Sequence, residues 1–319
     1  MRANLSRLGL GTVQWGLTYG VANVSGRPAQ DEVERMLKAA ADSGVNWLDT
    51  ARMYGESEEV IGRALKSTGL TDKFLIVSKT CQINPALAHS EVEVRRSIRE
   101  GVAASLKALG VRPIPVLLAH KGEDILIPGV WDELLEQKEK GNVESLGVSI
   151  SRNPVEVVER VLAFESMEAL QVAVNVFDQR LVRPGMLRKA SAKGVTVFVR
   201  SAYLQGLIVM PDERVPAHLA CALRFKKMVS DCARAWGRSV TETALQFVLG
   251  LPGVTAVVVG CETEAQVRDN VSLVSAPPLT AEQMKALLAM PDVPLEIVEP
   301  WRWEGSMKPY YAPPGRQDG

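Results

Sequence analysis

The sequence predicts a (β/α)8 barrel of the TIM type, formed by a single domain over residues 1–319. Short apolar runs alternate with amphipathic stretches along most of the chain. This alternation is typical of parallel strands joined by right-handed helical crossovers. The runs are continuous and rich in Val, Leu and Ile, as in strands buried on both faces. Eight runs are present, and the GxGxxG pattern of an open dinucleotide-binding sheet does not follow the first, so the closed barrel is favoured.

The eight strand candidates can be read in chain order. They are residues 7–12, 45–49, 73–79, 114–120, 143–149, 169–175, 195–201 and 254–260. After the first comes a long loop and then a stretch in which Val33, Met36 and Leu37 fall at helical spacing. Ser57 is expected to be the N-cap of the helix that follows the second strand. The seventh strand is followed by an insertion and then by a helix-like segment that begins HLACALRFKK.

The composition indicates a globular protein and excludes several kinds of partner. Hydrophobic residues make up 46% of the chain, and 37 Lys and Arg are balanced by 37 Asp and Glu. Proteins that bind nucleic acids or anionic membranes usually carry an excess of basic residues. No apolar run approaches the roughly 20 residues that cross a bilayer, and the N-terminus lacks the pattern of a signal peptide. We therefore expect a cytoplasmic monomer or small homo-oligomer that acts on a small molecule.

Neither the cysteines nor the C-terminal tail predicts an additional module. The four cysteines show no CxxC spacing and no grouping with the three histidines, so we expect reduced thiols and no metal site. No linker divides the chain. The segment 300–319 is aromatic and proline-rich without periodicity, and we expect its first half to pack on the barrel and the remainder to be partly irregular.

Polar side chains stand at the carboxyl ends of the predicted strands, where the active sites of such barrels form. They are Asp49, Lys79, His120, Ser149, Asn175, Arg200 and Ser201. At any single position, a polar residue is explained as well by a strand end that meets a polar loop as by a role in an active site. Lys79 is harder to explain in this way, because an ammonium group at the end of an apolar strand is costly to bury without a carboxylate nearby. Asp49, at the end of the preceding strand, would provide that carboxylate.

Tyr54 adds a proton donor to this pair. The pKa of a phenol is about 10, and a neighbouring ammonium group lowers it by stabilising the phenolate. Asp49 would keep Lys79 charged and in place, while His120 would donate a hydrogen bond to a carbonyl oxygen. The four residues suit proton transfer to an oxygen that is becoming an alkoxide, as in carbonyl reduction.

The chain resembles the aldo-keto reductases over nearly its whole length. The resemblance rests on seven segments in this order: GLGTVQWG, LDTARMYGESEEVIG, LIVSK, LLAH, LGVS, QVAVN and RSAYLQGL. It implies the barrel fold and a catalytic tetrad at Asp49, Tyr54, Lys79 and His120. It also implies hydride transfer between NADP or NAD and an aldehyde or ketone. Tyr54 would then be the general acid for reduction and the general base for alcohol oxidation.

The resemblance further implies a cofactor site along the strand ends. Its expected residues are Gly11, Thr12, Ser149, Gln171, Arg200, Ser201, Leu204, Gln205, Gly260, Glu262, Gln266 and Asn270. Ser149 and Gln171 match the family's contacts to the nicotinamide carboxamide, but Ile150 stands where many members have Asn. Arg200 stands where many members stack a Tyr on the nicotinamide. It either stacks by its guanidinium plane, reaches a phosphate or an acidic substrate, or pairs with a neighbouring loop.

The adenosine end departs most from the family pattern. Where many NADP-preferring members carry Lys and Arg, this chain has Gly260 and Gln266, with Glu262 and Glu264 between them. Carboxylates disfavour a 2′-phosphate but accept hydrogen bonds from a free ribose hydroxyl. Arg268 either restores phosphate affinity or is a solvated surface residue. The preference between NADP and NAD therefore stays open.

A substrate pocket is expected beside the tetrad. Its expected lining is Trp15, Tyr19, Met53 and Lys121, with Trp301 and Trp303 as further candidates. The opening WGLTYGVAN resembles bacterial members thought to act on sugar-like carbonyls, although aromatic walls stack on sugars and apolar substrates alike. The loop that follows the first strand is long enough to form a lid.

Two other functions compete with the oxidoreductase. The family includes potassium-channel beta subunits, so a regulatory subunit that binds the cofactor without significant turnover is the main alternative. The lack of an N-terminal extension and of an obvious partner-binding helix counts against it. An isomerase or hydrolase has little support, because the sequence shows no metal-ligand cluster and no phosphate-binding glycine loop.

Overall fold

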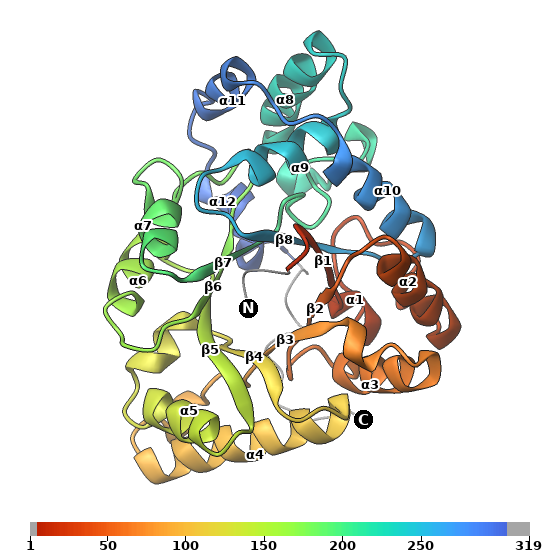
Figure 1. The fold of residues 1–319 in the computed structure, drawn as a ribbon. Helices are drawn as coiled ribbons and strands as arrows, with labels where there is room; N and C mark the ends of the chain where they lie inside the picture. Colours follow the sequence, from red (N-terminus) through yellow and green to blue (C-terminus); the bar gives the residue numbers. More distant parts are fainter. Residues whose placement is uncertain (1–4, 305–319) are drawn as a thin grey trace.

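The computed structural model describes residues 5–304, which include a closed barrel of eight parallel strands. The strands pair in chain order and β8 returns to β1, as Figure 1 shows along the barrel axis. They are β1 (Leu8–Gly11), β2 (Trp47–Asp49), β3 (Leu75–Lys79), β4 (Ile114–Ala119), β5 (Val143–Ile150), β6 (Ala169–Ala173), β7 (Thr196–Arg200) and β8 (Ala256–Gly260). The predicted fold class is confirmed, and each predicted strand is present.

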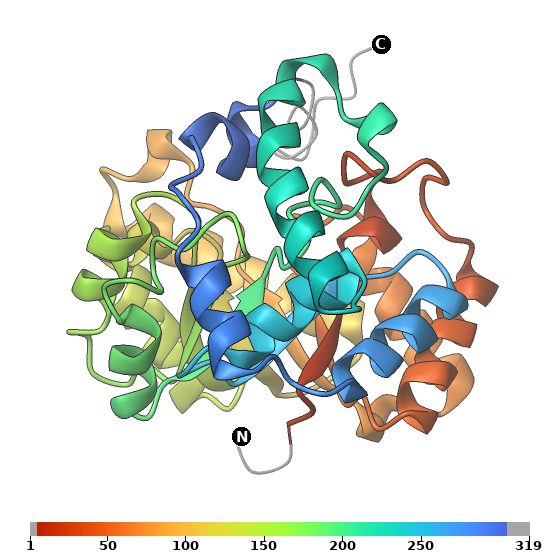
Figure 2. The same ribbon diagram turned by 90° about the horizontal axis from the view of Figure 1, so that it is seen from above.

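Helices surround the barrel (Figures 1 and 2). Those that cover successive strands are α2 (Gln30–Asp42), α3 (Ser57–Thr68), α4 (Glu91–Leu109), α5 (Val130–Glu139), α6 (Pro154–Val161), α7 (Met186–Ala192), α9 (Val240–Gly250) and α10 (Glu264–Ser275). Further helices are α1 (Val13–Gly16), α8 (Leu223–Ala235), α11 (Ala281–Leu288) and α12 (Leu295–Val298). The segment predicted as the seventh helix is α8, which is an addition to the barrel pattern. The helix that packs on β8 and α10 is α9, which the sequence analysis did not identify.

The helix signals agree with the structure except at α3. Val33, Met36 and Leu37 of α2 are fully buried, as their spacing predicts. Ser57, however, is not the N-cap of α3, because Glu56 occupies that position and Ser57 is the first helical residue. The Ser57 hydroxyl donates to the carbonyl of Thr12 at 2.9 Å and lies 2.7 Å from the Thr12 hydroxyl. Ser57 therefore ties the start of α3 to the end of β1.

Large apolar side chains fill the end of the barrel opposite the strands' carboxyl ends. Trp47 and Phe198 are fully buried, and their ring centroids lie 4.8 Å apart. A Cβ atom on Gly9 would lie only 2.1 Å from the Trp47 ring, so this position requires glycine. Since this end is packed, open space inside the barrel remains only near the carboxyl ends of the strands.

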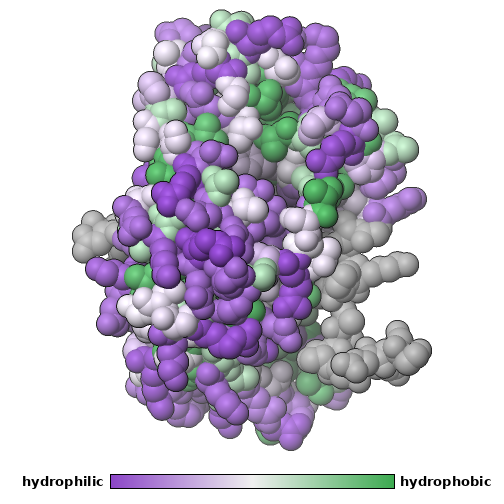
Figure 3. All heavy atoms as spheres, turned by 90° about the vertical axis from the view of Figure 1, so that its right-hand side faces the viewer, coloured by the Kyte–Doolittle hydropathy of each residue, from purple (hydrophilic) through white to green (hydrophobic). Residues whose placement is uncertain are grey.

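One face of the described surface is mostly polar. Figure 3 shows the face that carries α2, α3 and α10, where hydrophilic side chains predominate and hydrophobic ones are scattered. Among residues 5–304 no helix has the length and apolar character needed to span a bilayer. The expected packing of the tail is seen at Trp303, which is buried and donates its indole N–H to the carbonyls of Glu296 and Ile297. Residues 305–319 lie outside the described part.

A buried carboxylate holds the loop between β2 and α3. Glu58 is fully buried, and its two oxygens accept hydrogen bonds from Ser78 at 2.6 Å, Ser105 at 3.0 Å and Arg52 at 2.6 Å. These partners belong to β3, to α4 and to the loop itself. A buried charge with all its hydrogen bonds made is tolerated, whereas one that loses its partner is strongly destabilising.

We expect Glu58→Gln to lower the free energy of unfolding by about 3 kcal/mol, because it leaves the Arg52 guanidinium without its buried counter-charge. Urea denaturation followed by circular dichroism measures the change. Glu59→Gln is the matched control, since Glu59 also pairs with Arg52, at 2.9 Å, but its side chain is 37% exposed. That exposed pair should contribute less than about 1 kcal/mol. Equal losses in the two variants would contradict the assignment.

Candidate active site

A cavity of about 450 Å³ lies at the carboxyl ends of the strands. It is continuous from Tyr54 and His120 to Glu262 and Asn270 on the opposite side of the barrel mouth. Of the residues expected to bind a cofactor, all except Gln171 line this cavity. Of the polar residues predicted at strand ends, Asp49, His120, Ser149, Arg200 and Ser201 line the cavity, whereas Lys79 and Asn175 do not.

An ion pair lies at the floor of the cavity, where Asp49 is one of the lining residues and Lys79 is not. The Lys79 ammonium donates to Asp49 Oδ1 at 2.7 Å and to the carbonyl of Thr50 at 2.8 Å. Lys79 is 1% exposed and Asp49 is 4% exposed. The predicted pairing of these two side chains is thus present, and the second bond to Thr50 fixes the direction of the ammonium group.

The barrel register brings Asp49, Lys79 and His120 together. Asp49 pairs with Val77, two residues before Lys79, and Lys79 pairs with Leu118, two residues before His120. Side chains alternate between the two faces of a strand. A step of two residues therefore keeps all three side chains inside the barrel, each one level nearer the mouth than the last.

Tyr54 reaches the same place from the loop between β2 and α3. Its amide donates to Ala51 and its carbonyl accepts from Ser57. Gly16 packs against this carbonyl so closely that a Cβ atom would lie 1.8 Å from it. Gly55 follows in the left-handed region, with φ of 58°. These contacts hold the backbone at Tyr54, and its side chain lines the cavity.

The four side chains of the expected tetrad contact one another. The Lys79 ammonium lies 4.9 Å from the centroid of the Tyr54 ring. The rings of Tyr54 and His120 meet edge to face, with centroids 5.7 Å apart and an angle of 82°. Tyr54 and His120 both line the cavity, whereas Lys79 lies behind Tyr54. An ammonium group is thus placed where it would stabilise a phenolate.

The electrostatics keep His120 neutral. Burial, and then the positive charges of Lys79 and Arg200, lower the pKa of His120 to about 3. The imidazole is therefore uncharged near neutral pH, with one ring nitrogen that donates a hydrogen bond and one that accepts. Tyr19 packs against the small cluster that contains Tyr54, and its pKa is raised to about 12 by burial and by Tyr54. Tyr19 therefore stays protonated.

Gln171 is directed to the Asp49–Lys79 ion pair, and it is not among the residues that line the cavity. It is fully buried, and its amide donates to Asp49 Oδ1 at 2.6 Å. Ser149, which lines the cavity, donates to Gln171 Oε1 at 3.4 Å. Ile150 is buried and supplies no polar group, but the next residue, Ser151, lines the cavity. Sequence analysis had not identified Ser151.

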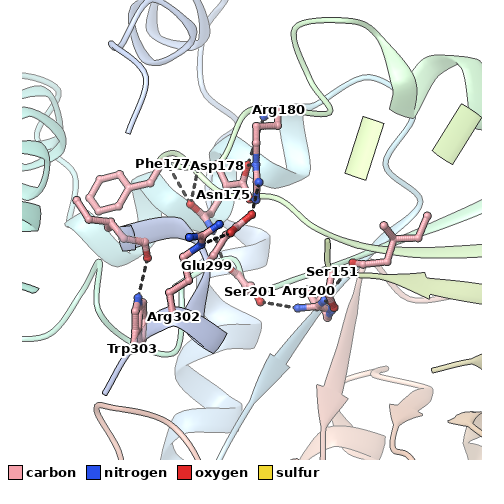
Figure 4. A network of polar contacts seen from close by, with 12 residues as sticks. Ser151, Asn175, Phe177, Asp178, Arg180, Arg200, Ser201, Glu299, Arg302 and Trp303 are labelled. Atoms are coloured by element: carbon pink, nitrogen blue, oxygen red, sulfur yellow. Dashed lines mark hydrogen bonds and ion pairs between the residues drawn. The ribbon is translucent and has the colours of Figure 1, made fainter. Parts of the chain in front are cut away.

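Arg200, the last residue of β7, is held by neutral acceptors. It donates to the Ile150 carbonyl at 3.1 Å, to the Ser151 hydroxyl at 2.6 Å and to the Ser201 hydroxyl at 3.2 Å. Figure 4 shows it between β7 and the segment after β5. The alternative of an ion pair with a neighbouring loop is not what the structure shows, because none of the ion pairs found within residues 5–304 involves Arg200.

The loop after β7 has an unusual backbone. Ser201, Leu204 and Gln205 have φ of 64°, 49° and 54°, a region that costs side-chain-bearing residues about 1–3 kcal/mol. All three line the cavity. Asn175, expected among the polar strand ends, supports this loop instead, since its amide donates to the Ser201 carbonyl at 3.0 Å.

A buried lysine fixes the far end of the same loop. Lys226 of α8 is 5% exposed and donates to the carbonyls of Leu207 and Ile208, both at 3.0 Å, and of Met210 at 2.7 Å. Its ammonium also lies 3.5 Å from Asp212. Three carbonyl acceptors satisfy its three N–H donors. The added helix α8 thus holds the loop in place.

The β8–α10 side of the cavity carries carboxylates. Glu262 and Gln266 line it and bond each other, with Gln266 Nε2 donating to Glu262 Oε2 at 3.0 Å. Asp269 also lines the cavity. Arg268 does not line it, since it pairs with Glu264 at 2.7 Å and its side chain is 57% exposed. Of the two alternatives for Arg268, the solvated surface residue is confirmed.

The expected substrate lining is met only in part. Tyr19 lines the cavity, and so does Trp301. Trp15 does not, because its ring is buried in the core and donates to the Cys261 carbonyl at 3.1 Å. Met53 and Lys121 also lie away from the lining; the Met53 sulfur instead accepts from the backbone of a neighbouring loop. Position next to a catalytic residue in the sequence did not decide which side chains reach the cavity.

A charged network holds the C-terminal segment against the cavity (Figure 4). Arg180 donates to Asp178 at 2.7–2.8 Å and to Glu299 at 2.6 Å. Arg302 donates to the same carboxylate at 2.6 Å. The network fixes Trp301 in the cavity wall. Asp178 and Arg180 also line the cavity, and the sequence analysis missed them; the charged pair in NVFDQR, just after a predicted strand end, was the available signal.

The cysteines form no bonds with one another. All four are free, and Cys81 is half-buried, with its pKa raised by burial. Within residues 5–304 no group of three or more His, Cys, Asp or Glu side chains could hold a metal ion.

The chain matches several proteins of one family along most of its length. It is 26% identical over 290 residues to an L-galactose dehydrogenase of Arabidopsis thaliana, covering 85% of each chain. It is 26% identical over 302 residues to an NADH-specific methylglyoxal reductase of Escherichia coli, covering 84% of this chain and 89% of the other. An aldo-keto reductase of Bacillus halodurans, solved in its holo form, has the same fold, with a TM-score of 0.73 and 24% identity over 89% of this chain and 91% of its own.

The model of one protein family, described as the aldo/keto reductase family, matches residues 7–290. This range contains the whole barrel and every residue of the expected tetrad. By its sequence, its closed barrel and the arrangement at the strand ends, the chain belongs to the aldo/keto reductase family.

Proposed function

We propose that this protein reduces the carbonyl group of a small polar aldehyde or ketone to an alcohol with NADH, and oxidises the alcohol in the reverse direction. The observation that carries the proposal is the buried Lys79 ammonium, which lies between Asp49, at 2.7 Å, and the Tyr54 ring, at 4.9 Å. A phenol backed by a held positive charge suits proton transfer to a carbonyl oxygen.

Each residue of the tetrad has a separate task in this proposal. Ser149, Ser201 and the other lining residues would hold a reduced nicotinamide, which would supply the hydride for the carbonyl carbon. Tyr54 gives its hydroxyl proton to the carbonyl oxygen, so that an alcohol forms and a phenolate remains. Lys79 stabilises that phenolate, and Asp49 keeps Lys79 charged. Solvent then returns a proton to Tyr54.

His120 would orient the carbonyl. Because its pKa is lowered to about 3, it acts as a neutral hydrogen-bond donor and not as an acid near pH 7. A donor beside the phenol fixes the carbonyl oxygen at the point where Tyr54 can reach it.

The charges at the β8–α10 side support NADH over NADPH. Glu262 and Asp269 line the cavity where the resemblance expects the adenosine, and Arg268 is turned outward into its pair with Glu264. A 2′-phosphate dianion would meet two carboxylates and no free arginine there, whereas a ribose hydroxyl could donate to Glu262. The Escherichia coli relative is named as NADH-specific, which agrees with this proposal.

The cavity wall supports a small polar substrate. Tyr19 and Trp301 offer aromatic faces, while Asp178 and Arg180 add hydrogen-bonding groups near them. Such a mixture suits hydroxylated carbonyl compounds, which stack by their apolar faces and bond by their hydroxyls. Two relatives bear the names of a sugar dehydrogenase and a methylglyoxal reductase, so methylglyoxal and L-galactose are suitable first substrates.

Tyr54→Phe removes the proton donor and keeps the ring. We expect kcat for methylglyoxal reduction, or for whichever carbonyl compound is turned over, to fall by about 10²–10⁴-fold, the usual contribution of general acid catalysis. Loss of NADH absorbance measures the rate. NADH quenching of tryptophan fluorescence should be unchanged, which controls for folding. Wild-type turnover in the variant would exclude Tyr54 as the acid, and NADH binding without turnover of any carbonyl would point to the regulatory subunit.

His120 should make the unfolding free energy depend on pH. Its native pKa of about 3 lies below the ordinary value of about 6.5. Between these values the unfolded chain binds a proton that the native chain does not, so the native state loses stability as the pH falls below about 6.5. The loss is at most about 1.4 kcal/mol per pH unit.

In His120→Gln this loss disappears. As the pH falls from about 7 to about 4, the free energy of unfolding should therefore fall more in the wild type than in the variant. Urea denaturation at each pH measures both values. His89→Gln is the matched control, because His89 is exposed, and we expect it to follow the wild type. A constant difference between wild type and His120→Gln would show that His120 is charged in the folded protein.

Cofactor preference can be tested by removing one charge. We expect the wild type to bind NADH at least about tenfold more tightly than NADPH, as measured by fluorescence titration. Glu262→Gln removes a carboxylate that would repel the 2′-phosphate, so NADPH should bind more tightly and the ratio should narrow. Tighter binding of NADPH than NADH by the wild type would refute the proposed preference.

A further inference from the structure

Arg200 differs from Arg180, the other arginine of the cavity lining, because no carboxylate within residues 5–304 forms an ion pair with it. Its three hydrogen bonds go to one carbonyl and two hydroxyls (Figure 4). Arg180, in contrast, is bound by Asp178 and Glu299. An exposed arginine would be compensated by water, but Arg200 is only partly exposed and faces a cavity. Its charge is therefore felt by whatever occupies that cavity.

The catalytic end of the cavity has no other net charge among its described side chains. Lys79 is paired with Asp49, and His120 is neutral. The carboxylates without cationic partners, Glu262 and Asp269, lie on the β8–α10 side. Arg200 contributes to the lowered pKa of His120, which shows that its field reaches the tetrad. The cavity is thus positive near its reacting end and negative at the other.

The barrel register places Arg200 beside the expected carboxamide site. Gln171 pairs with both Ser149 and Phe198, and Arg200 is two residues beyond Phe198 on β7. Arg200 therefore faces inward like Phe198, and it lies about 6.6 Å nearer the mouth than the paired residues Ser149, Gln171 and Phe198. A ring whose carboxamide bonded Ser149 would have Arg200 as a neighbour.

We propose that Arg200 makes this protein distinguish the oxidation states of the nicotinamide, so that it binds the neutral reduced ring more tightly than the cationic oxidised ring. The inference rests on the proposed function. Loss of a hydride converts the ring from neutral to positively charged, whereas Arg200 is positive in both states. Repulsion between like charges therefore appears only after hydride transfer. Because the oxidised ring is bound more weakly, the equilibrium between the bound reactants shifts toward the reduced cofactor and the carbonyl compound, which is the direction of alcohol oxidation. The same repulsion speeds release of the oxidised cofactor.

The pyrophosphate of the cofactor is an alternative partner for the Arg200 guanidinium. If Arg200 instead bound the pyrophosphate of the cofactor, it would strengthen both oxidation states equally, because both carry the same pyrophosphate. The ratio of the two dissociation constants separates these cases. ADP-ribose, which has the pyrophosphate and no nicotinamide, provides an independent probe.

The experiment measures Kd for NAD+, NADH and ADP-ribose by isothermal titration calorimetry with wild type, Arg200→Gln and Arg200→Lys. We expect the ratio of Kd for NAD+ to Kd for NADH to fall about fivefold or more in Arg200→Gln, the effect of one partly screened unit charge. Arg200→Lys should keep most of the wild-type ratio, because it keeps the charge. ADP-ribose should bind all three proteins with similar Kd.

Arg152→Gln is the matched control. Arg152 is exposed near the same mouth, where its guanidinium lies 5.6 Å from the Trp301 ring, and it does not line the cavity. Its removal should leave the ratio unchanged, which would show that the effect depends on position and not on net charge. Thermal unfolding of each variant checks that the protein remains folded.

Each other outcome overturns the proposal in a distinguishable way. Equal weakening of NAD+, NADH and ADP-ribose in Arg200→Gln would assign Arg200 to the pyrophosphate. An unchanged ratio with unchanged affinities would show that Arg200 does not act on the ring. If the wild type bound none of the three ligands, the proposed function itself would fail, and with it this inference.

Discussion

The site depends on the burial of one ammonium group at the end of β3. Lys79 is almost completely enclosed, so its charge has to be compensated inside the protein. Asp49 provides the counter-charge, and Gln171 donates to the same Asp49 oxygen from the opposite side of the barrel. Three strands are thereby linked through one carboxylate. Because the ammonium cannot leave this position without losing its compensation, the Tyr54 ring packed above it has a fixed electrostatic environment.

Buried ionic contacts also hold the loops that carry the functional residues. Glu58 anchors the loop with Tyr54, and Lys226 anchors the loop after β7. Arg180 and Glu299 hold the segment that places Trp301 in the wall. Loops lack the regular hydrogen bonds of helices and strands, so side chains have to fix them. In each case a charged group buried against carbonyls or an opposite charge provides a contact with a single favourable geometry.

The charges of the cavity divide it into two functional regions. Near the tetrad the ion pair is closed and His120 is neutral, which leaves the field of Arg200 to dominate. On the β8–α10 side the carboxylates of Glu262 and Asp269 dominate. A dinucleotide is itself asymmetric, with a ring that changes charge at one end and a ribose that is either free or phosphorylated at the other. In the proposed function, the two regions of the cavity would act on separate properties of the cofactor.

The sequence by itself determined the barrel and the polar strand ends, because apolar runs of strand length and helical spacing are local properties of the chain. Asp49, Lys79 and His120 could be identified because strand ends in a barrel converge wherever the strands lie in the sequence. Only the tertiary structure decided which neighbouring side chains reach the cavity. Trp15 turns into the core and Gln171 turns to Asp49, because their partners come from distant parts of the chain, whereas Arg268 turns outward to Glu264, four residues earlier in α10. The contacts of Trp15 and Gln171 join residues far apart in the sequence, and periodicity does not encode such contacts.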